Sequence, residues 1–203
     1  MLNRTRVVYT DDLTHDLIVT NNSDNLYGAQ VWIENLDSSI SKNFVVAPQL
    51  FKINPGDNQI MRMYRTNLSL DNDRESLFWI NVQEIPQKSN NESSGLVMAF
   101  RNKIKLLYRP NAISKDRYES ESKMTWTLKG EKLTIKNPTP YYFAISNVKL
   151  DGKKNVTVSR RPTRPFSKTV FDLGGFRDFN SLEVETIDDY GALQVFELFE
   201  EKM

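Results

Sequence analysis

LVMAFRNKIKLLYRP, residues 96–110, is the most informative segment of this chain. Its first half carries alternate apolar side chains on one face, those of Leu96, Met98 and Phe100. In its second half, lysines alternate with aliphatic residues. Alternation with a period of two over this length predicts one long β-strand. Such a strand at the edge of a sheet can pair with another chain, so we expect the protein to use it.

Short runs rich in β-branched and aromatic residues recur on both sides of this stretch, separated by clusters of Asn, Asp, Gly and Pro. The strands expected before it are 4–9, 15–20, 30–34, 59–64 and 77–84. The strands expected after it are 124–128, 132–136, 142–150, 168–171, 182–186 and 194–198. Many short strands with turns at regular intervals predict an all-β protein built from β-sandwiches.

The length of 203 residues accommodates two domains of about 100 residues each. After Pro110 the sequence becomes polar and loses its alternation until residue 124. We therefore predict a first sandwich over residues 1–110, a linker over 111–123 with room for one helical turn, and a second sandwich over 124–203.

Composition narrows the possible partners. The formal net charge of +1 gives no reason to expect nucleic acid or another polyanion. No run of 18 apolar residues is present, so we expect no insertion into a membrane. The absence of cysteine excludes thiol chemistry and cysteine-ligated metals, but it says nothing about the compartment. Charged residues among the first 20 interrupt any signal-peptide core, which taken alone favours the cytoplasm.

An enzyme is not favoured by the sequence, and we assign no catalytic residue, metal or cofactor. The single histidine, His15, lacks a partner histidine or cysteine in the sequence. The segment DNDRE, residues 71–75, begins like a calcium loop but lacks its glycine at position six and its glutamate at position twelve. A hydrolase that uses these acids is a distant alternative.

Arg6 and Lys105 are the two residues whose chemistry conflicts with their surroundings. Each lies inside an apolar strand pattern, where burial of a charge is unfavourable unless an anion is bound. Two ordinary explanations remain open: each side chain could extend to solvent, or it could pair with a nearby carboxylate.

Several blocks of the chain together resemble the periplasmic pilus-assembly chaperones of the PapD type. They are NRTRVVY (3–9), NPGDNQIMRM (54–63), DRESLFWINVQEIPQ (73–87), IKLLYRP (104–110), NPTPYYF (137–143) and DDYGA (188–192). The resemblance implies two immunoglobulin-like β-sandwich domains at an angle, with an interdomain cleft. It also implies a periplasmic protein whose signal peptide has been removed. Such a protein binds and caps pilus (fimbrial) subunits by donor-strand complementation and delivers them to an outer-membrane usher.

The resemblance assigns roles to particular residues. By the RTR and IKL motifs, Arg6 and Lys105 would bind the terminal carboxylate of a pilus subunit. Leu96, Met98 and Phe100 would be the side chains that a donor strand inserts into the groove of that subunit. Judged by pattern alone, these three residues could equally belong to the core of the first sandwich.

Glu75, Arg109 and Asp189 would form a charge network between the domains, which the resemblance implies through the DRESLF, YRP and DYG motifs. The connection 86–96 is short and is not bracketed by cysteines, which fits the short-loop branch of the family. The main alternative function is an extracellular immunoglobulin-like adhesion or binding module. Pilin and usher genes beside the gene would favour the chaperone.

Overall fold

The structure is a computed structural model, and it describes residues 2, 4–11, 15–66, 69–86, 98–156, 162–175 and 178–201. Two compact units are present. The first consists of Met1–Leu70 and Ser76–Tyr108, and the second of Asp71–Glu75 and Arg109–Met203. Each unit has its own buried apolar core, so each is described separately.

The first unit is built from eight described strands. They are β1 (Arg6–Tyr9), β2 (His15–Thr20), β3 (Tyr27–Glu34), β4 (Phe44–Ala47), β5 (Leu50–Ile53), β6 (Asn58–Arg65), β7 (Ser76–Pro86) and β8 (Arg101–Tyr108). The five strands predicted before residue 96 are present, with boundaries shifted by up to three residues. Strands β4 and β5 were not expected, because four residues are too few to display a clear period.

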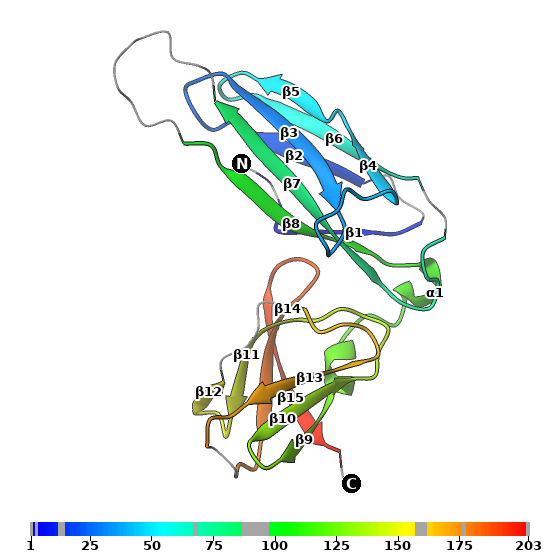
Figure 1. Cartoon of the computed structure of the whole chain (residues 1–203), viewed down its shortest axis with the longest axis vertical. Helices are drawn as coiled ribbons and strands as arrows, with labels where there is room; N and C mark the ends of the chain where they lie inside the picture. The colour runs from blue at the N-terminus through cyan, green and yellow to red at the C-terminus, as the bar shows by residue number, and fades with distance from the viewer. Residues whose placement is uncertain are drawn as a thin grey trace. The chain divides into compact units, whose positions relative to one another are not determined.

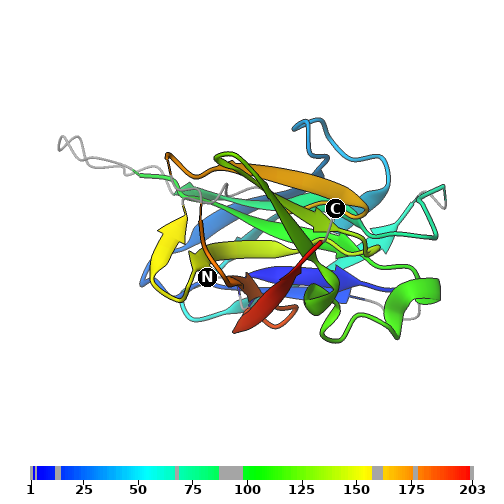
Figure 2. The same cartoon turned by 90° about the horizontal axis from the view of Figure 1, so that it is seen from below.

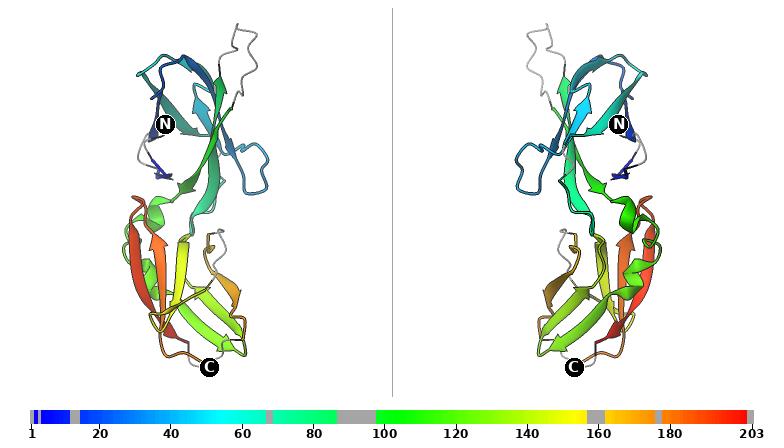
Figure 3. Two further views of the ribbon diagram at one scale, coloured as in Figure 1. Left: turned by 90° about the vertical axis from the view of Figure 1, so that its left-hand side faces the viewer. Right: turned by 90° about the vertical axis from the view of Figure 1, so that its right-hand side faces the viewer.

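These strands form two sheets that face each other across one core, and both layers are visible in Figure 3. One sheet has the order β1-β8-β7-β3-β5, and the other has the order β2-β6-β4; both can be followed in Figure 1. Leu106 and Tyr108 of β8 are fully buried in the core between the sheets. The residues that alternate with them, such as Lys105, therefore lie on the outer face of the larger sheet.

Strand β8 is shorter than the sequence predicted. It begins at Arg101, and Met98–Phe100 precede it without strand structure. The expected start at Leu96 lies outside the described residues. Nor is β8 a simple edge strand, because it lies between β1 and β7. Alternation specifies which side chains share a face, but it cannot specify where neighbouring strands begin and end.

The second unit contains seven described strands and two short helices. They are α1 (Asn111–Ser114), the 3-10 helix η1 (Ser120–Lys123), β9 (Thr125–Lys129), β10 (Lys132–Asn137), β11 (Ala144–Leu150), β12 (Lys154–Val156), β13 (Ser167–Asp172), β14 (Leu182–Ile187) and β15 (Leu193–Glu200). The strands predicted for this unit are present, and the short β12 was missed.

The strands of the second unit follow the order β12-β11-β14-β15-β9-β10-β13. Among the described strands, the two halves of this sheet join through a short parallel contact between β15 and β9. Figure 2 shows β15 in red and β13 in orange on opposite sides of this unit. Side chains from both halves form one core, which includes Trp126 and Phe143. The chain is therefore all-β with two sandwiches, as predicted.

The unit boundaries differ from those expected from the sequence. Asp71–Glu75 belongs to the second unit, because the amide of Glu75 donates a hydrogen bond to the carbonyl of Pro140 at 2.9 Å. Residues 111–123, which we expected to be a linker, also lie in the second unit. Ser120 and Glu121 are buried there. A polar composition without alternation indicated a linker, but polar side chains can be buried when they find partners.

Candidate functional site

One row of side chains crosses four strands on the outer face of the first unit. Glu34 of β3 lies directly opposite Trp79 of β7. Trp79 lies opposite Lys105 of β8, and Lys105 lies beside Arg6 of the parallel strand β1. The two cations that the sequence singled out are thus brought together by the pairing of strands almost 100 residues apart in sequence.

Arg6 and Lys105 have an unusual environment for charged residues. Arg6 is 8% exposed, and Lys105 is half-buried. Burial lowers the pKa of Lys105, and the neighbouring charge of Arg6 lowers it further. Within the described part of the chain, no carboxylate forms a salt bridge with Lys105. A partly desolvated ammonium group in this position is suited to bind an external anion.

The neighbouring lysine of β8 differs in this respect. Lys103 Nζ donates a hydrogen bond to Glu34 Oε2 at 2.9 Å, while Trp32 Nε1 donates to Glu34 Oε1 at 2.7 Å. Burial alone would raise the pKa of Glu34, but these hydrogen bonds outweigh burial and lower it. Lys103 is therefore already neutralised by a carboxylate of the same unit.

Strand β8 has a neighbour on both sides along only half its length. Strand β1 pairs with residues 105–108, whereas β7 pairs with β8 from Arg101 to Tyr108. Among the described residues, no strand covers the other side of residues 101–104. An open backbone edge therefore begins directly beside Lys105.

The apolar residues before β8 are exposed. Met98 is 59% exposed and Phe100 is 57% exposed, so neither belongs to the core of the first unit. The carbonyl of Phe100 accepts a hydrogen bond from the amide of Glu84 at 2.9 Å, which holds this segment beside β7. Leu96, the third predicted donor residue, lies outside the described residues.

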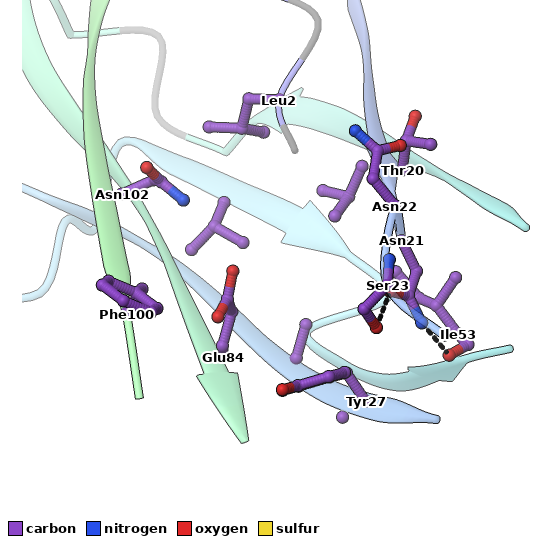
Figure 4. Close-up of a pocket in the computed structure, with 14 residues that line it drawn as sticks. Leu2, Thr20, Asn21, Asn22, Ser23, Tyr27, Ile53, Glu84, Phe100 and Asn102 are labelled. Atoms are coloured by element: carbon purple, nitrogen blue, oxygen red, sulfur yellow. Dashed lines mark hydrogen bonds between the residues drawn. The ribbon is translucent and has the colours of Figure 1, made fainter. Parts of the chain in front are cut away.

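Phe100 also lines a cavity of about 530 Å³ at the end of the first unit. Figure 4 shows its ring beside the cavity, with Glu84 and Tyr27 nearby and Asn21 across from it. An aromatic ring that borders an open cavity lacks partner atoms on one side, so it can still gain contacts with another molecule.

Arg109 connects the other two residues of the predicted charge network. Its Nε donates to Glu75 Oε1 at 2.7 Å, and its Nη1 and Nη2 donate to Asp189 at 2.7 and 3.0 Å. The second oxygen of Glu75 accepts the amide of Tyr142 at 2.7 Å. Burial opposes the charge on Arg109, but the two carboxylates raise its pKa.

All three residues of this network lie in the second unit. The first domain was expected to extend to residue 110 and therefore to include Glu75 and Arg109, so the prediction that the network lies between the domains is wrong: it lies within the second unit. Glu75 directly precedes β7, and Arg109 directly follows β8. Their side chains are held by the second unit. The chain therefore passes from the second unit to the first directly after Glu75, and returns to the second unit at Arg109.

The other sequence candidates do not assemble into a site. Arg74 forms salt bridges with Asp71 and Asp73, so the acids of this segment are held by ion pairs. His15 Nε2 accepts a hydrogen bond from the amide of Thr10. No cluster of metal-binding side chains is present among the described residues. In the same part of the chain, neither helix has the length or apolar character needed to cross a bilayer.

Sequence reasoning missed Glu34 and Trp79. Trp79 lies in the block LFWINV, a run of apolar and aromatic residues that is typical of a strand, so nothing in the sequence set it apart from its neighbours. A glutamate at the end of a strand of aliphatic and aromatic residues, as in VWIE, was a signal of the same kind as Arg6 and Lys105. Its pairing with Lys103, which is 69 residues away in the sequence, could be identified only from the folded structure.

Comparison with known families gives two matches that together span most of the chain. Residues 1–114 match the family described as pili and flagellar-assembly chaperone, PapD N-terminal domain. Residues 119–197 match the family described as pili assembly chaperone PapD, C-terminal domain.

Individual proteins agree with these matches. The chain is 38% identical to the chaperone protein FanE of Escherichia coli, covering 94% of this chain and 86% of FanE. It is 36% identical to FocC of Escherichia coli, with 95% and 86% covered. Among solved structures, the Salmonella enterica SafA pilin in complex with the SafB chaperone matches with a TM-score of 0.87 and 26% identity, covering 97% of this chain and 94% of that chain. The Escherichia coli chaperone DraB matches with a TM-score of 0.86 and 30% identity, covering 99% and 96%.

Proposed function

Because the chain belongs to the family of PapD-like pilus-assembly chaperones, we propose that it captures pilus subunits in the periplasm by their terminal carboxylate. Arg6 and Lys105 bind that carboxylate. The segment from Met98 into β8 caps the subunit by supplying the strand that the subunit lacks, and the subunit is then delivered to an outer-membrane usher.

One observation carries the proposal that Arg6 and Lys105 form an anchor for the subunit carboxylate. The half-buried ammonium of Lys105 lies beside Arg6, and no carboxylate of the described chain neutralises it. Like charges on directly opposite residues of neighbouring strands are destabilising. A carboxylate bound between these cations would relieve that repulsion and form charge-assisted hydrogen bonds.

The position of the anchor on β8 supports the strand-capping part of the proposal. Residues 101–104 are open on one side and lie between Lys105 and the exposed Phe100. A subunit strand that ends at Lys105 can therefore extend along this open edge, with the carboxylate fixing its register. Alternate side chains of the donor segment would then fill pockets of the subunit.

The charge network has a structural role in this proposal. Glu75 and Arg109 fix, within the second unit, the chain directly before β7 and directly after β8. Those are the strands that carry Trp79 and Lys105. No catalytic step is included, since the acids of residues 71–75 are engaged in ion pairs.

Purification of the tagged protein from a periplasmic extract, followed by mass spectrometry, tests this function. We expect pilus subunits to be recovered together with the chaperone. Recovery from the periplasm without any pilus subunit would contradict subunit capture, and recovery only from the cytoplasm would contradict the location. An extracellular immunoglobulin-like adhesion module, the alternative, would instead appear at the cell surface; the family membership does not favour it.

A further inference from the structure

Trp79 separates a carboxylate from the proposed anchor. It lies between Glu34 and Lys105 in the same cross-strand row, and it is their immediate neighbour on either side. Two strand spacings amount to about 10 Å between the backbones of Glu34 and Lys105. A glutamate and a lysine side chain together can span that distance when nothing lies between them, so an internal ion pair would be within reach.

The indole contacts both lysines of β8. Lys103 Nζ lies 5.3 Å from its ring centroid and Lys105 Nζ lies 5.5 Å from it. Both distances are within the range of cation–π attraction, which is about 6 Å. The two lysines have different neighbours, however: Lys103 Nζ donates a hydrogen bond to Glu34, while Lys105 is the cross-strand neighbour of Arg6.

Glu34 is held on the far side of Trp79 by two donors. Trp32 Nε1 and Lys103 Nζ each occupy one of its carboxylate oxygens, and Glu34 is 7% exposed. A carboxylate bound in this way can rotate toward another cation only if both hydrogen bonds are given up or rearranged.

We propose that Trp79 is a positioning residue that keeps the ammonium of Lys105 away from Glu34 and thus available to a subunit carboxylate. This inference rests on the anchor function proposed above. Without the indole, Lys105 can turn toward Glu34 and form an internal ion pair that competes with the ligand. The binding defect of a Trp79 variant would then depend on Glu34, which loss of packing alone would not produce.

The test combines Trp79→Leu with the double variant Trp79→Leu/Glu34→Gln. The first measurement uses the free protein and follows Lys105 by NMR during a pH titration. In the wild type the pKa of Lys105 is lowered by burial. We expect it to rise in Trp79→Leu, because a new carboxylate partner favours the charged form, and to fall back in the double variant.

The second measurement is the amount of pilus subunit that co-purifies with each variant. We expect Trp79→Leu to lose about tenfold, as when one charge-assisted hydrogen bond to the ligand is lost. The double variant should recover most of the binding. Trp79→Phe, which keeps an aromatic spacer, should resemble the wild type, and Trp79→Met replaces the leucine variant if the latter does not fold.

The Lys105 pKa and the amount of co-purified subunit together distinguish the positioning role of Trp79 from the anchor function of Lys105. An unchanged Lys105 pKa in Trp79→Leu, or a binding defect that Glu34→Gln does not relieve, would overturn the role of Trp79. A raised Lys105 pKa with unchanged subunit binding would support the positioning role of Trp79 and contradict the anchor function instead.

Discussion

Arg6 and Lys105 are direct neighbours on the parallel strands β1 and β8. Two cations in such a position repel each other, and Arg6 is almost completely buried. The contact between these two cations does not by itself stabilise the first unit. We therefore expect that substitution of either cation reduces binding of the pilus subunit and leaves the chaperone folded.

The first prediction concerns this anchor. Lys105→Ala and Arg6→Ala should each abolish capture of pilus subunits, because loss of a charged hydrogen bond to a partner costs about 2–5 kcal/mol. That corresponds to a loss of affinity of ~30-fold or more. Co-purified subunit is the measurement, and Lys52→Ala, an exposed lysine of β5, is the matched control. Normal subunit recovery with both variants would exclude the carboxylate anchor.

The second prediction concerns the exposed residues before β8. Met98→Glu and Phe100→Glu should abolish subunit binding, since a charge cannot enter an apolar pocket of the subunit without an unfavourable loss of hydration. Both side chains are more than half exposed, so the melting temperature should hardly change. Ile60→Glu, at a comparably exposed position on β6, is the control and should bind normally. A large drop in melting temperature would instead mean that these residues stabilise the chaperone itself.

The third prediction concerns the charge network. Arg109→Ala should lower the free energy of unfolding by about 3–5 kcal/mol, because it leaves two carboxylates without their partner. Glu75→Ala and Asp189→Ala should each have a smaller effect, since Arg109 keeps one carboxylate in either variant. Denaturant unfolding measures the difference. Arg62→Ala, which breaks an exposed pair with Asp16, should change stability by no more than about 1 kcal/mol.

If Arg109→Ala is no more destabilising than Arg62→Ala, the network does not hold the second unit together. Reduced subunit capture by Arg109→Ala at full stability would point to a direct role in binding. Neither result is expected, because the guanidinium uses three nitrogens on its two partners.

The fourth prediction concerns His15 and pH. Burial lowers the pKa of His15 and the charge of Arg4 acts in the same direction, while the hydrogen bond with Thr10 and the charge of Asp16 oppose them without cancelling them. The unfolded chain then binds more protons than the folded one below about pH 6.5. The free energy of unfolding should therefore fall as the pH drops from 7.5 to 5.5, and level off below the folded pKa.

His15→Phe removes this titration while keeping an aromatic ring against Tyr9, whose ring centroid lies 4.6 Å from that of His15 with the planes tilted by 42°. The slope of unfolding free energy against pH between 7.5 and 5.5 should be smaller in this variant, whatever its absolute stability. An identical slope in the two proteins would assign the pH dependence to other groups.

The amino-acid sequence was sufficient to predict most of the strands and which side chains share a face. Alternation put Leu106 on one face of the strand and Lys105 on the other, because a strand turns successive side chains to opposite sides, and in the structure Leu106 is buried in the core. The motifs also identified Glu75, Arg109 and Asp189 as one network before any contact between them was visible. The resemblance fixed the family, because its blocks recur along nearly the whole chain.

Which distant strands are neighbours, and where their pairing stops, became known from the folded structure. It showed that β1 covers only half of β8, that Glu34 neutralises Lys103 while Trp79 separates it from Lys105, and that the second unit holds Glu75. A local pattern specifies the period of side chains along one strand. Cross-strand pairs depend on register and strand order, which are set by contacts between segments far apart in sequence.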